Sequence, residues 1–174
     1  IVHSLAVGFS LDGERGVRDP RGMVGETLGV DMHVLTGDAA PQRNLELCIN
    51  RAHLSVERMV ATPYASALAA LVDDEAEMGA ACIDMGGGTT TLSVFSEGKF
   101  VYADAIPVGG GHVTHDLARG LSTRLEDAER LKVMHGSALQ TGADDRDIVS
   151  VPPMGGEDSD VPLQVPRAVL TRIV

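Results

Sequence analysis

The residues best suited to chemistry in this 174-residue chain are a carboxylate and the run of glycines that follows it. Asp84 ends the apolar stretch 79–84, and after one further residue come Gly86, Gly87, Gly88, Thr89 and Thr90. Glycines let the backbone turn sharply and present successive N–H groups to one anion, and threonine hydroxyls add donors beside them. An acid at a strand end can hold a hydrated Mg²⁺ or orient a water against a phosphate. The pattern favours a nucleotide phosphate site, and it is not a Walker loop because no Gly-Lys-Ser/Thr follows.

A second glycine cluster, Gly109–Gly111, lies one hairpin later, between a predicted strand and a predicted helix. Taken alone, the first cluster is explained better as a hairpin turn with Asp84 as its cap. Helix N-termini also favour anions, so two glycine turns can face one phosphate chain. The second cluster therefore favours the phosphate site, and it adds Gly110 and Gly111 to the candidate residues.

Glu129 and Lys132 stand three residues apart, on one face of a predicted helix. Taken alone, the pair is explained better as a surface salt bridge that stabilises the helix by a few tenths of a kcal/mol. Because the pair follows two glycine turns, it is also placed to flank a ribose and a base. The spacing leaves both interpretations open.

The N-terminal half is predicted to alternate strands and helices. We expect strands over 1–10, 30–36 and 56–61, a glycine- and charge-rich connection over 12–29, and helices over 38–54 and 62–71. In the first helix, the spacing of four residues predicts one buried stripe: Leu45, Cys48, Ile49 and Ala52. The acidic run 73–77 is predicted to be a solvated loop.

The C-terminal half changes its pattern at residue 79. We expect strands over 79–84, 89–95 and 100–107, with a hairpin turn over 96–99, and helices over 112–120 and 124–135. Thr123 and Glu126 have the spacing of a capping box for the second of these helices. Residues 142–164 are predicted to be an exposed loop apart from a short strand over 147–151, and a last helix is expected from Pro166.

Composition limits the class of protein. The net charge of −11 argues against a nucleic-acid partner, which would need clustered Lys and Arg. A hydrophobic fraction of 44% is enough for a packed core, and no run approaches the ~18 apolar residues of a membrane helix. Cys48 and Cys82 are expected to be reduced, buried thiols, and the six histidines to be at the surface or hydrogen-bonded. A start at Ile1, inside a predicted strand, suggests an internal piece of a longer polypeptide.

Several stretches resemble the FtsA family of bacterial cell-division proteins, within the actin/heat-shock-chaperone ATPase superfamily. The segment ACIDMGGGTTTLSVF resembles the phosphate-2 segment of the superfamily. The stretches IPVGGGHVTHDLA, DAERLKVMHGSAL and GVRDPRGMVGETLGVDMHVLTG resemble FtsA in wording and spacing. The implied fold class is α/β, a partial actin-like (ribonuclease-H-like) ATPase fold with part of the FtsA-specific 1C subdomain, also called SHS2.

This resemblance implies a division of the chain into four parts. Residues 1–36 would be the second half of 1C, 37–76 the end of subdomain 1A, 77–122 the start of 2A with the phosphate-2 hairpin, and 123–174 the start of 2B. The implied structure would be a three-stranded antiparallel start to a larger sheet, with a two-stranded piece from 1C.

The resemblance also implies that the cofactors are ATP and Mg²⁺ and that the residues named above hold them. Asp84 would be the acid near Mg²⁺, acting through water, and near the attacking water. Gly86, Gly87, Gly88 and Thr89 would hold the β- and γ-phosphates, with Thr90 beside them. Gly110 and Gly111 would form the second glycine turn, and Glu129 and Lys132 would meet the ribose and adenine. We expect the piece alone to bind ATP weakly or not at all, and we leave enzymatic activity open, at most as a slow ATPase.

The partners implied by the resemblance belong to bacterial division. The whole protein would polymerise with itself, tether the FtsZ polymer to the inner face of the cell membrane through a C-terminal helix absent from this chain, and recruit later division proteins through 1C. It would be cytoplasmic and peripheral to that membrane at the division site. The alternatives are an MreB-type filament or a type IV pilus adaptor, and a sugar-kinase- or phosphatase-type enzyme of the same superfamily.

Overall fold

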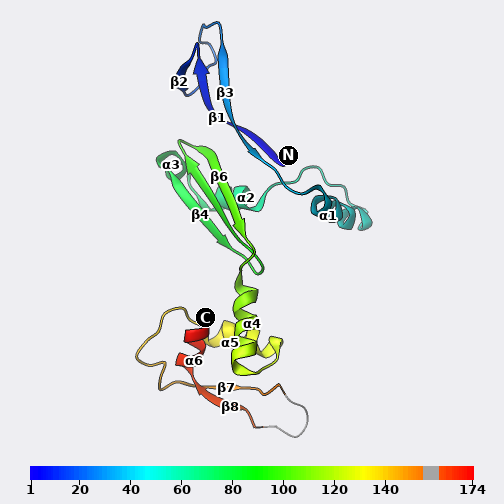
Figure 1. The fold of residues 1–174 in the computed structure, drawn as a ribbon, viewed down its shortest axis with the longest axis vertical. Coiled ribbons are helices and arrows are strands. Elements are labelled where there is room, and N and C mark those ends of the chain that lie inside the picture. The colour runs from blue at the N-terminus through cyan, green and yellow to red at the C-terminus, as the bar shows by residue number, and fades with distance from the viewer. Residues whose placement is uncertain (155–160) are drawn as a thin grey trace. The chain divides into compact units, whose positions relative to one another are not determined.

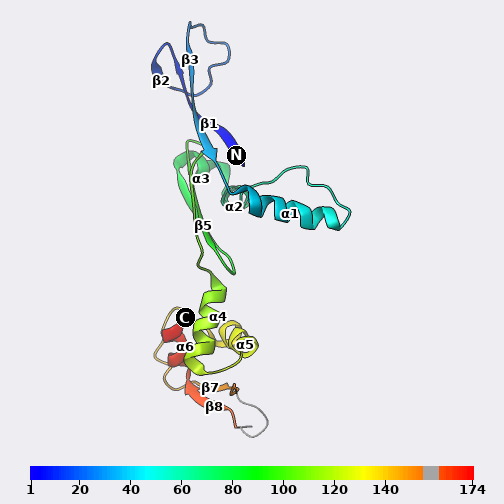
Figure 2. The ribbon, with the colours of Figure 1, turned by 45° about the vertical axis from the view of Figure 1, so that its right-hand side comes forward.

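The computed structural model describes residues 1–154 and 161–174, which divide into two compact units. Residues 1–84 and 91–106 form unit 1, and residues 85–90 and 107–174 form unit 2. Figures 1 and 2 label the elements.

The first sheet of unit 1 has three antiparallel strands in the order β2-β1-β3. They are β1 (His3–Leu11), β2 (Glu14–Val17) and β3 (Leu28–Leu35). Asp12 and Gly13 join β1 to β2 with φ angles of 51° and 87°, as a two-residue hairpin turn requires. The sequence predicted two strands here, and that prediction is wrong because the 12–29 connection contains β2. The Asp-Gly pair was the available signal for the missed hairpin.

The second sheet contains β4 (Ala80–Met85), β5 (Thr90–Ser96) and β6 (Lys99–Ile106), in the order β4-β5-β6. All three strands were predicted, and so was the turn, where Glu97 and Gly98 have φ angles of 52° and 70°. Phe95 of β5 and Phe100 of β6 pack with Ala67 of α2 (Thr62–Ala70). These three buried residues form a small core between the sheet and the helix.

Two histidines of the first sheet make hydrogen bonds to other parts of unit 1. His3 Nε2 accepts the N–H of Ala61 at 2.9 Å, and His33 Nδ1 lies 2.9 Å from the carbonyl of Phe100. The prediction that such histidines are hydrogen-bonded is therefore confirmed for these two residues.

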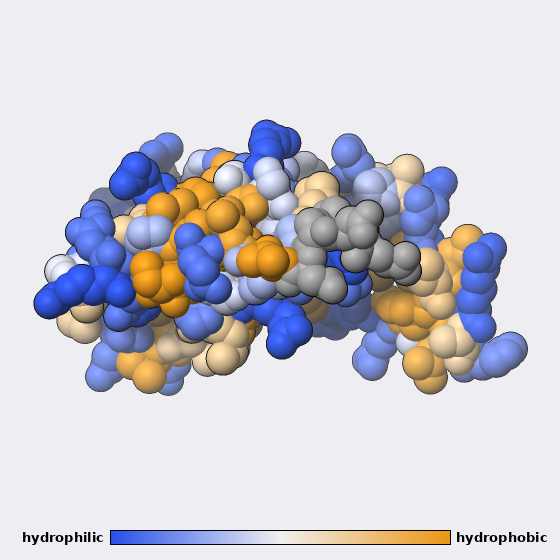
Figure 3. Space-filling model, turned by 90° about the horizontal axis from the view of Figure 1, so that it is seen from below, coloured by the Kyte–Doolittle hydropathy of each residue, from blue (hydrophilic) through white to orange (hydrophobic). Residues whose placement is uncertain are grey.

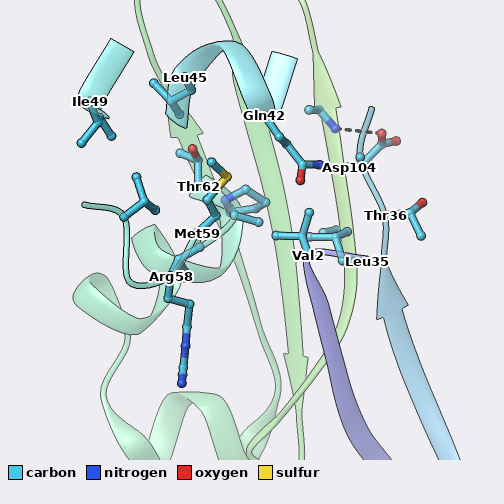
Figure 4. A pocket seen from close by; sticks show the side chains of 17 residues that line it. Val2, Leu35, Thr36, Gln42, Leu45, Ile49, Arg58, Met59, Thr62 and Asp104 are labelled. Carbon is cyan, nitrogen blue, oxygen red and sulfur yellow. Dashed lines mark hydrogen bonds between the residues drawn. The ribbon is translucent and has the colours of Figure 1, made fainter. Parts of the chain in front are cut away.

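Helix α1 (Ala39–Arg51) forms where it was predicted, but it buries none of its residues. The predicted buried stripe is therefore wrong: Leu45 is 58% exposed and Cys48 is exposed, whereas the other free thiol, Cys82, is half-buried. Figure 4 shows the side chains of Leu45 and Ile49 beside a cavity of about 720 Å³ that Met59 also lines. The apolar face of α1 borders an open space and not a packed core.

Two further expectations for unit 1 are wrong. The acidic run forms a short helix, α3 (Asp73–Met78), whose first turn holds three acids. Negative side chains are favourable at a helix N-terminus, so the charge that suggested a solvated loop suits this helix start. Residues 56–61 form no strand.

The described residues of unit 2 form three helices and a strand pair. Its elements are α4 (Gly110–Leu121), α5 (Leu125–His135), β7 (Ile148–Val151), β8 (Leu163–Pro166) and α6 (Arg167–Ile173). The helices and β7 pack into one apolar core around Leu117 and Leu170. Figure 3, seen from below the view of Figure 1, shows apolar side chains gathered at the surface. In unit 2, Ile148 and Leu163 are exposed.

The predicted helices of unit 2 are present, but two local predictions are wrong. Thr123 does not cap α5: it is fully buried, its hydroxyl donates to the carbonyl of Pro152 at 2.6 Å, and Arg124 takes the cap position. The predicted loop 142–164 holds the buried Asp144, and a second strand, β8, begins in it at Leu163. Part of that predicted loop, residues 155–160, lies outside the described residues. Across the described ranges, no helix is long and apolar enough to cross a bilayer.

Candidate functional site

The two glycine clusters are joined by backbone hydrogen bonds within unit 2. The N–H of Gly110 donates to the carbonyl of Gly86 at 2.9 Å, and the N–H of Gly111 donates to the carbonyl of Gly87 at 2.7 Å. The hydroxyl of Thr90 donates to the carbonyl of Val108 at 2.7 Å. The start of α4 therefore holds the first glycine turn in place through the carbonyl groups of that turn.

Gly109 is the point of closest approach between the two clusters. A Cβ atom at this position would lie 2.4 Å from the carbonyl oxygen of Gly86 and 2.8 Å from that of Gly87. Both neighbours are backbone atoms, which cannot move aside as a flexible side chain would. Glycine is required at position 109 because two segments of the backbone approach each other closely there.

Gly87 and Gly88 are different, because nothing in the fold requires glycine at either position. A Cβ atom on either residue would meet no atom within 4 Å, neither residue has a positive φ, and both are exposed. Within the described part of unit 2, neither of their N–H groups donates to another residue. The outer face of the turn thus offers unshielded amides and free space, as an anion nest does.

Helix α5 places an ion pair against the second glycine turn. Lys132 Nζ lies 2.7 Å from Glu129 Oε2, and it donates to the carbonyl of Gly110 at 3.0 Å and to the hydroxyl of Thr114 at 2.8 Å. The Thr114 hydroxyl also contacts Glu129 Oε2. The structure therefore brings Glu129 and Lys132 together with Gly110, and they are not an isolated surface pair.

The hydrogen bonds of this group favour the charged form of Glu129. Donation from Lys132, and after it from Thr114, lowers the pKa of the Glu129 carboxyl below its ordinary value. Its side chain is 50% exposed, whereas that of Lys132 is 22% exposed. The carboxylate is thus held ionised at the surface by donors that lie deeper.

Asp84 belongs to unit 1 and stands two residues before Gly86 in the chain. Its side chain is half-buried, and Oδ2 accepts a hydrogen bond from the Ser66 hydroxyl on α2 at 2.6 Å. One carboxylate oxygen is therefore fixed by a neutral donor. The described residues contain no group of three or more His, Cys, Asp or Glu side chains that could hold a metal ion.

Two family models match the chain. The model described as cell division protein FtsA matches residues 81–171, and the model of the SHS2 domain inserted in FtsA matches residues 1–36. The first of these covers more than half of the chain. The chain belongs to the FtsA family.

Curated relatives in the FtsA family match the full length of this chain. Cell division protein FtsA of Rhizobium meliloti is 72% identical over 174 residues, which are 100% of this chain and 39% of the relative. The proteins of the same name from Pseudomonas aeruginosa and Escherichia coli are 34% and 29% identical, and each match covers 100% of this chain and 41% of the relative. The chain therefore spans about two fifths of the length of these FtsA proteins.

Solved structures establish the fold class. MreB5 of Spiroplasma citri bound to ADP matches with a TM-score of 0.58 at 22% identity, over 79% of this chain and 44% of that chain. The same protein bound to AMPPNP matches with the same TM-score at 20% identity, over 79% and 43%. The predicted fold class is confirmed: this FtsA chain is part of an actin-like α/β fold.

The sequence did not predict three residues that contact the candidate site of this FtsA chain. Thr114 lies four residues after Gly110, one helical turn into α4. His112 Nδ1 accepts the N–H of Gly109 at 3.1 Å, and Ser66 contacts Asp84. The i, i+4 spacing from Gly110 was the only available signal for Thr114, and no spacing could have linked Ser66 to an acid 18 residues later.

Proposed function

We propose that this chain carries the phosphate- and ribose-binding part of an ATP site in a cell-division protein. The observation that carries the proposal is the contrast between the glycines. Gly109 is required by the fold, whereas Gly87 and Gly88 leave amides and space that the fold does not use. Glycine at such positions is explained by the close approach of an anionic ligand to the backbone.

The roles within the phosphate part follow from the hydrogen bonds. The turn Gly86–Thr89 would hold the β- and γ-phosphates, with Thr90 beside it, while Gly110 and Gly111 support the turn because their amides already bind its carbonyls. Asp84 would bind Mg²⁺ through water, and Ser66 fixes its Oδ2. ATP with Mg²⁺ supplies the polyanionic ligand that suits this set of donors. We assign no catalytic rate beyond that of a slow ATPase.

The ribose end of the site would be formed by α5. Glu129 offers a half-exposed carboxylate, which suits the hydroxyl donors of a ribose. Two MreB structures of the same fold were solved with ADP and with AMPPNP, which supports an adenine nucleotide as the ligand here.

At the level of the whole protein, we propose the adaptor role in division. It would polymerise with ATP bound, tether FtsZ to the inner face of the cell membrane through a C-terminal helix, and recruit later division proteins. Residues 1–36 would serve recruitment and subunit contacts as part of 1C, and residues 37–76, 77–122 and 123–174 would belong to 1A, 2A and 2B. Full-length relatives named as cell-division proteins support this role over a pilus adaptor, an MreB-type filament or a sugar-kinase-type enzyme.

The test is sedimentation of the full-length protein with FtsZ and vesicles of acidic lipid, with and without Mg-ATP. We expect FtsZ to pellet with the vesicles only when the full-length protein is present, and to pellet more with Mg-ATP. Gly88→Ala should weaken ATP binding by at least about tenfold because its Cβ occupies the ligand's space. Gly142→Ala is the matched control in unit 2, since its Cβ also meets no atom within 4 Å and Gly142 is remote from the turn in the chain. Absence of FtsZ from the pellet in both conditions would exclude the adaptor role.

A further inference from the structure

The contacts of Lys132 leave it no free donor. A lysine ammonium has three N–H groups. Three acceptors lie within 3.0 Å of Nζ: the Gly110 carbonyl, the Thr114 hydroxyl and Glu129 Oε2. Lys132 therefore links α5 to the first turn of α4 and holds Thr114 and Glu129 together.

Glu129 has one occupied and one free oxygen. Lys132 and Thr114 both contact Oε2, and within the described part of unit 2 no group donates to Oε1. Since the side chain is 50% exposed, Oε1 is the oxygen available to a hydroxyl of a bound molecule.

Thr114 connects these contacts. It is 7% exposed, and its single hydroxyl proton lies between two acceptors, Glu129 Oε2 and the Gly110 carbonyl at 3.1 Å. The contact to the carboxylate is the shorter one and is charge-assisted, so the proton goes to Glu129 while the oxygen accepts from Lys132. Without this hydroxyl, Oε2 would lose a donor and Lys132 would lose an acceptor.

We propose that Thr114 is a positioning residue that aligns Glu129 Oε1 with the vicinal hydroxyls of a ribonucleotide. The inference rests on the proposed ATP site and adds a determinant of its selectivity. The alignment makes the site select a ribose over a sugar that lacks the hydroxyls, because the buried donors hold the carboxylate in one orientation before the ligand arrives.

The test is the ratio of affinities for ATP and for 2′,3′-dideoxy-ATP, measured by calorimetry on the full-length protein. We expect wild type to prefer ATP by about tenfold or more, which is the value of a hydrogen bond to a charged group. Thr114→Val keeps the shape but removes the hydroxyl, and the ratio should fall toward one. Thr114→Ser should restore it.

The matched control is Thr171→Val in α6. Thr171 is 9% exposed, and its hydroxyl lies near the carbonyl four residues earlier, as that of Thr114 does, but Thr171 is remote from Glu129 in the chain. This variant should keep the wild-type ratio. A merely structural effect of Thr114→Val would lower both affinities together and leave the ratio unchanged, and that result overturns the inference.

A measurement on wild type keeps the inference testable if Thr114→Val does not fold. With ¹³C-labelled glutamate, and with Glu129→Gln to assign the signal, the Glu129 carboxyl shift should respond to ATP and not to dideoxy-ATP. An equal response to both overturns the inference. If wild type binds neither nucleotide, the proposed ATP site itself fails, and this outcome is distinct from binding without selectivity.

Discussion

Neighbouring glycines in this chain have different physical reasons to be glycine. A Cβ atom added at Gly109 would lie 2.4 Å from a carbonyl oxygen of the first turn, and one added at Gly111 would lie 3.0 Å from another. A Cβ atom added at Gly87 or Gly88 would have open space. The sequence could predict that the two clusters form turns, because three adjacent glycines are informative by themselves. It could not predict which of them serve the fold, since that depends on which backbone the turn meets.

A matched pair of variants separates the two reasons. Gly109→Ala should lower the free energy of unfolding by about 1–3 kcal/mol, because the new Cβ overlaps backbone atoms that must shift. Gly87→Ala should leave it within about 0.5 kcal/mol, because its Cβ meets nothing. Urea unfolding of the full-length protein measures both. Equal losses in the two variants would contradict the division of roles between the glycines.

Ser66 provides a second prediction at the level of single residues. Its hydroxyl donates to Asp84 Oδ2 at 2.6 Å, so it fixes a carboxylate that we propose to hold Mg²⁺ through water. Removing such a supporting partner commonly weakens metal affinity by about 10–100-fold. Ser66→Ala should therefore raise the Mg²⁺ concentration at which ATP binding is half-maximal by about tenfold.

The control for this prediction is a serine that lacks the contact. Ser55→Ala changes an exposed residue of the same unit and should leave the Mg²⁺ dependence unchanged. Ser66→Thr keeps a hydroxyl, so its Mg²⁺ dependence of ATP binding should be close to that of wild type. If Ser66→Ala binds Mg-ATP as wild type does, the hydroxyl plays no part in the metal site.

At the level of elements, periodicity predicted which segments form strands and helices, but not what covers them. The pattern of α1 correctly indicated a helix with an apolar face, and the structure leaves that face beside an open cavity. The strands β4, β5 and β6 were predicted well because each is a short run that contains apolar residues and that glycine or hairpin turns bound. α3 was missed because its sequence is short and acidic, and β8 was missed because it has only four residues and forms by pairing with β7.

Asp144 shows how a segment read as an exposed loop becomes part of the core. It is 1% exposed, and its carboxylate accepts hydrogen bonds from the N–H and the hydroxyl of Thr141, both at 2.8 Å. Arg167 lies 3.8 Å away and also donates to the carbonyl of His135, at the end of α5. The group fastens the connection after α5 to the start of α6.

The pH dependence of stability follows from this group. The hydrogen bonds from Thr141, with the charge of Arg167, lower the pKa of Asp144 below its ordinary value of 3.8. The carboxyl is harder to protonate in the folded state, so its stabilisation is fully present above about pH 4 and is lost as the pH falls through the folded pKa. Asp144→Asn should therefore lower the Tm at pH 7, and the difference from wild type should shrink as the pH falls below 4. Calorimetry over pH 3–7 measures it, and a Tm difference that does not change with pH would contradict the assignment.

At the level of the whole molecule, the chain supplies part of a fold. It covers 39% of the length of its Rhizobium meliloti relative and matches 44% of an MreB chain. The sequence was enough to identify the family because the stretches between residues 79 and 139 resemble it with high specificity, and residues 16–37 add to the resemblance. Family resemblance also predicted the site residues, whereas the contacts among them, such as those of Thr114, required the structure.

The last prediction concerns what this part can do alone. The glycine turn offers a phosphate chain only one set of donors, and a half-exposed Glu129 offers the sugar only one side. Small ligands bind tightly when most of their surface is enclosed, typically about 70–90% of it. A polypeptide of residues 1–174 should therefore bind ATP at least about a hundredfold more weakly than the full-length protein, a difference of about 2.7 kcal/mol. Calorimetry of both, with amide exchange to show that unit 2 keeps its helices in the shorter polypeptide, makes the comparison. Equal affinities would mean that residues 1–174 already enclose the nucleotide, and the rest of the protein would then be unnecessary for binding.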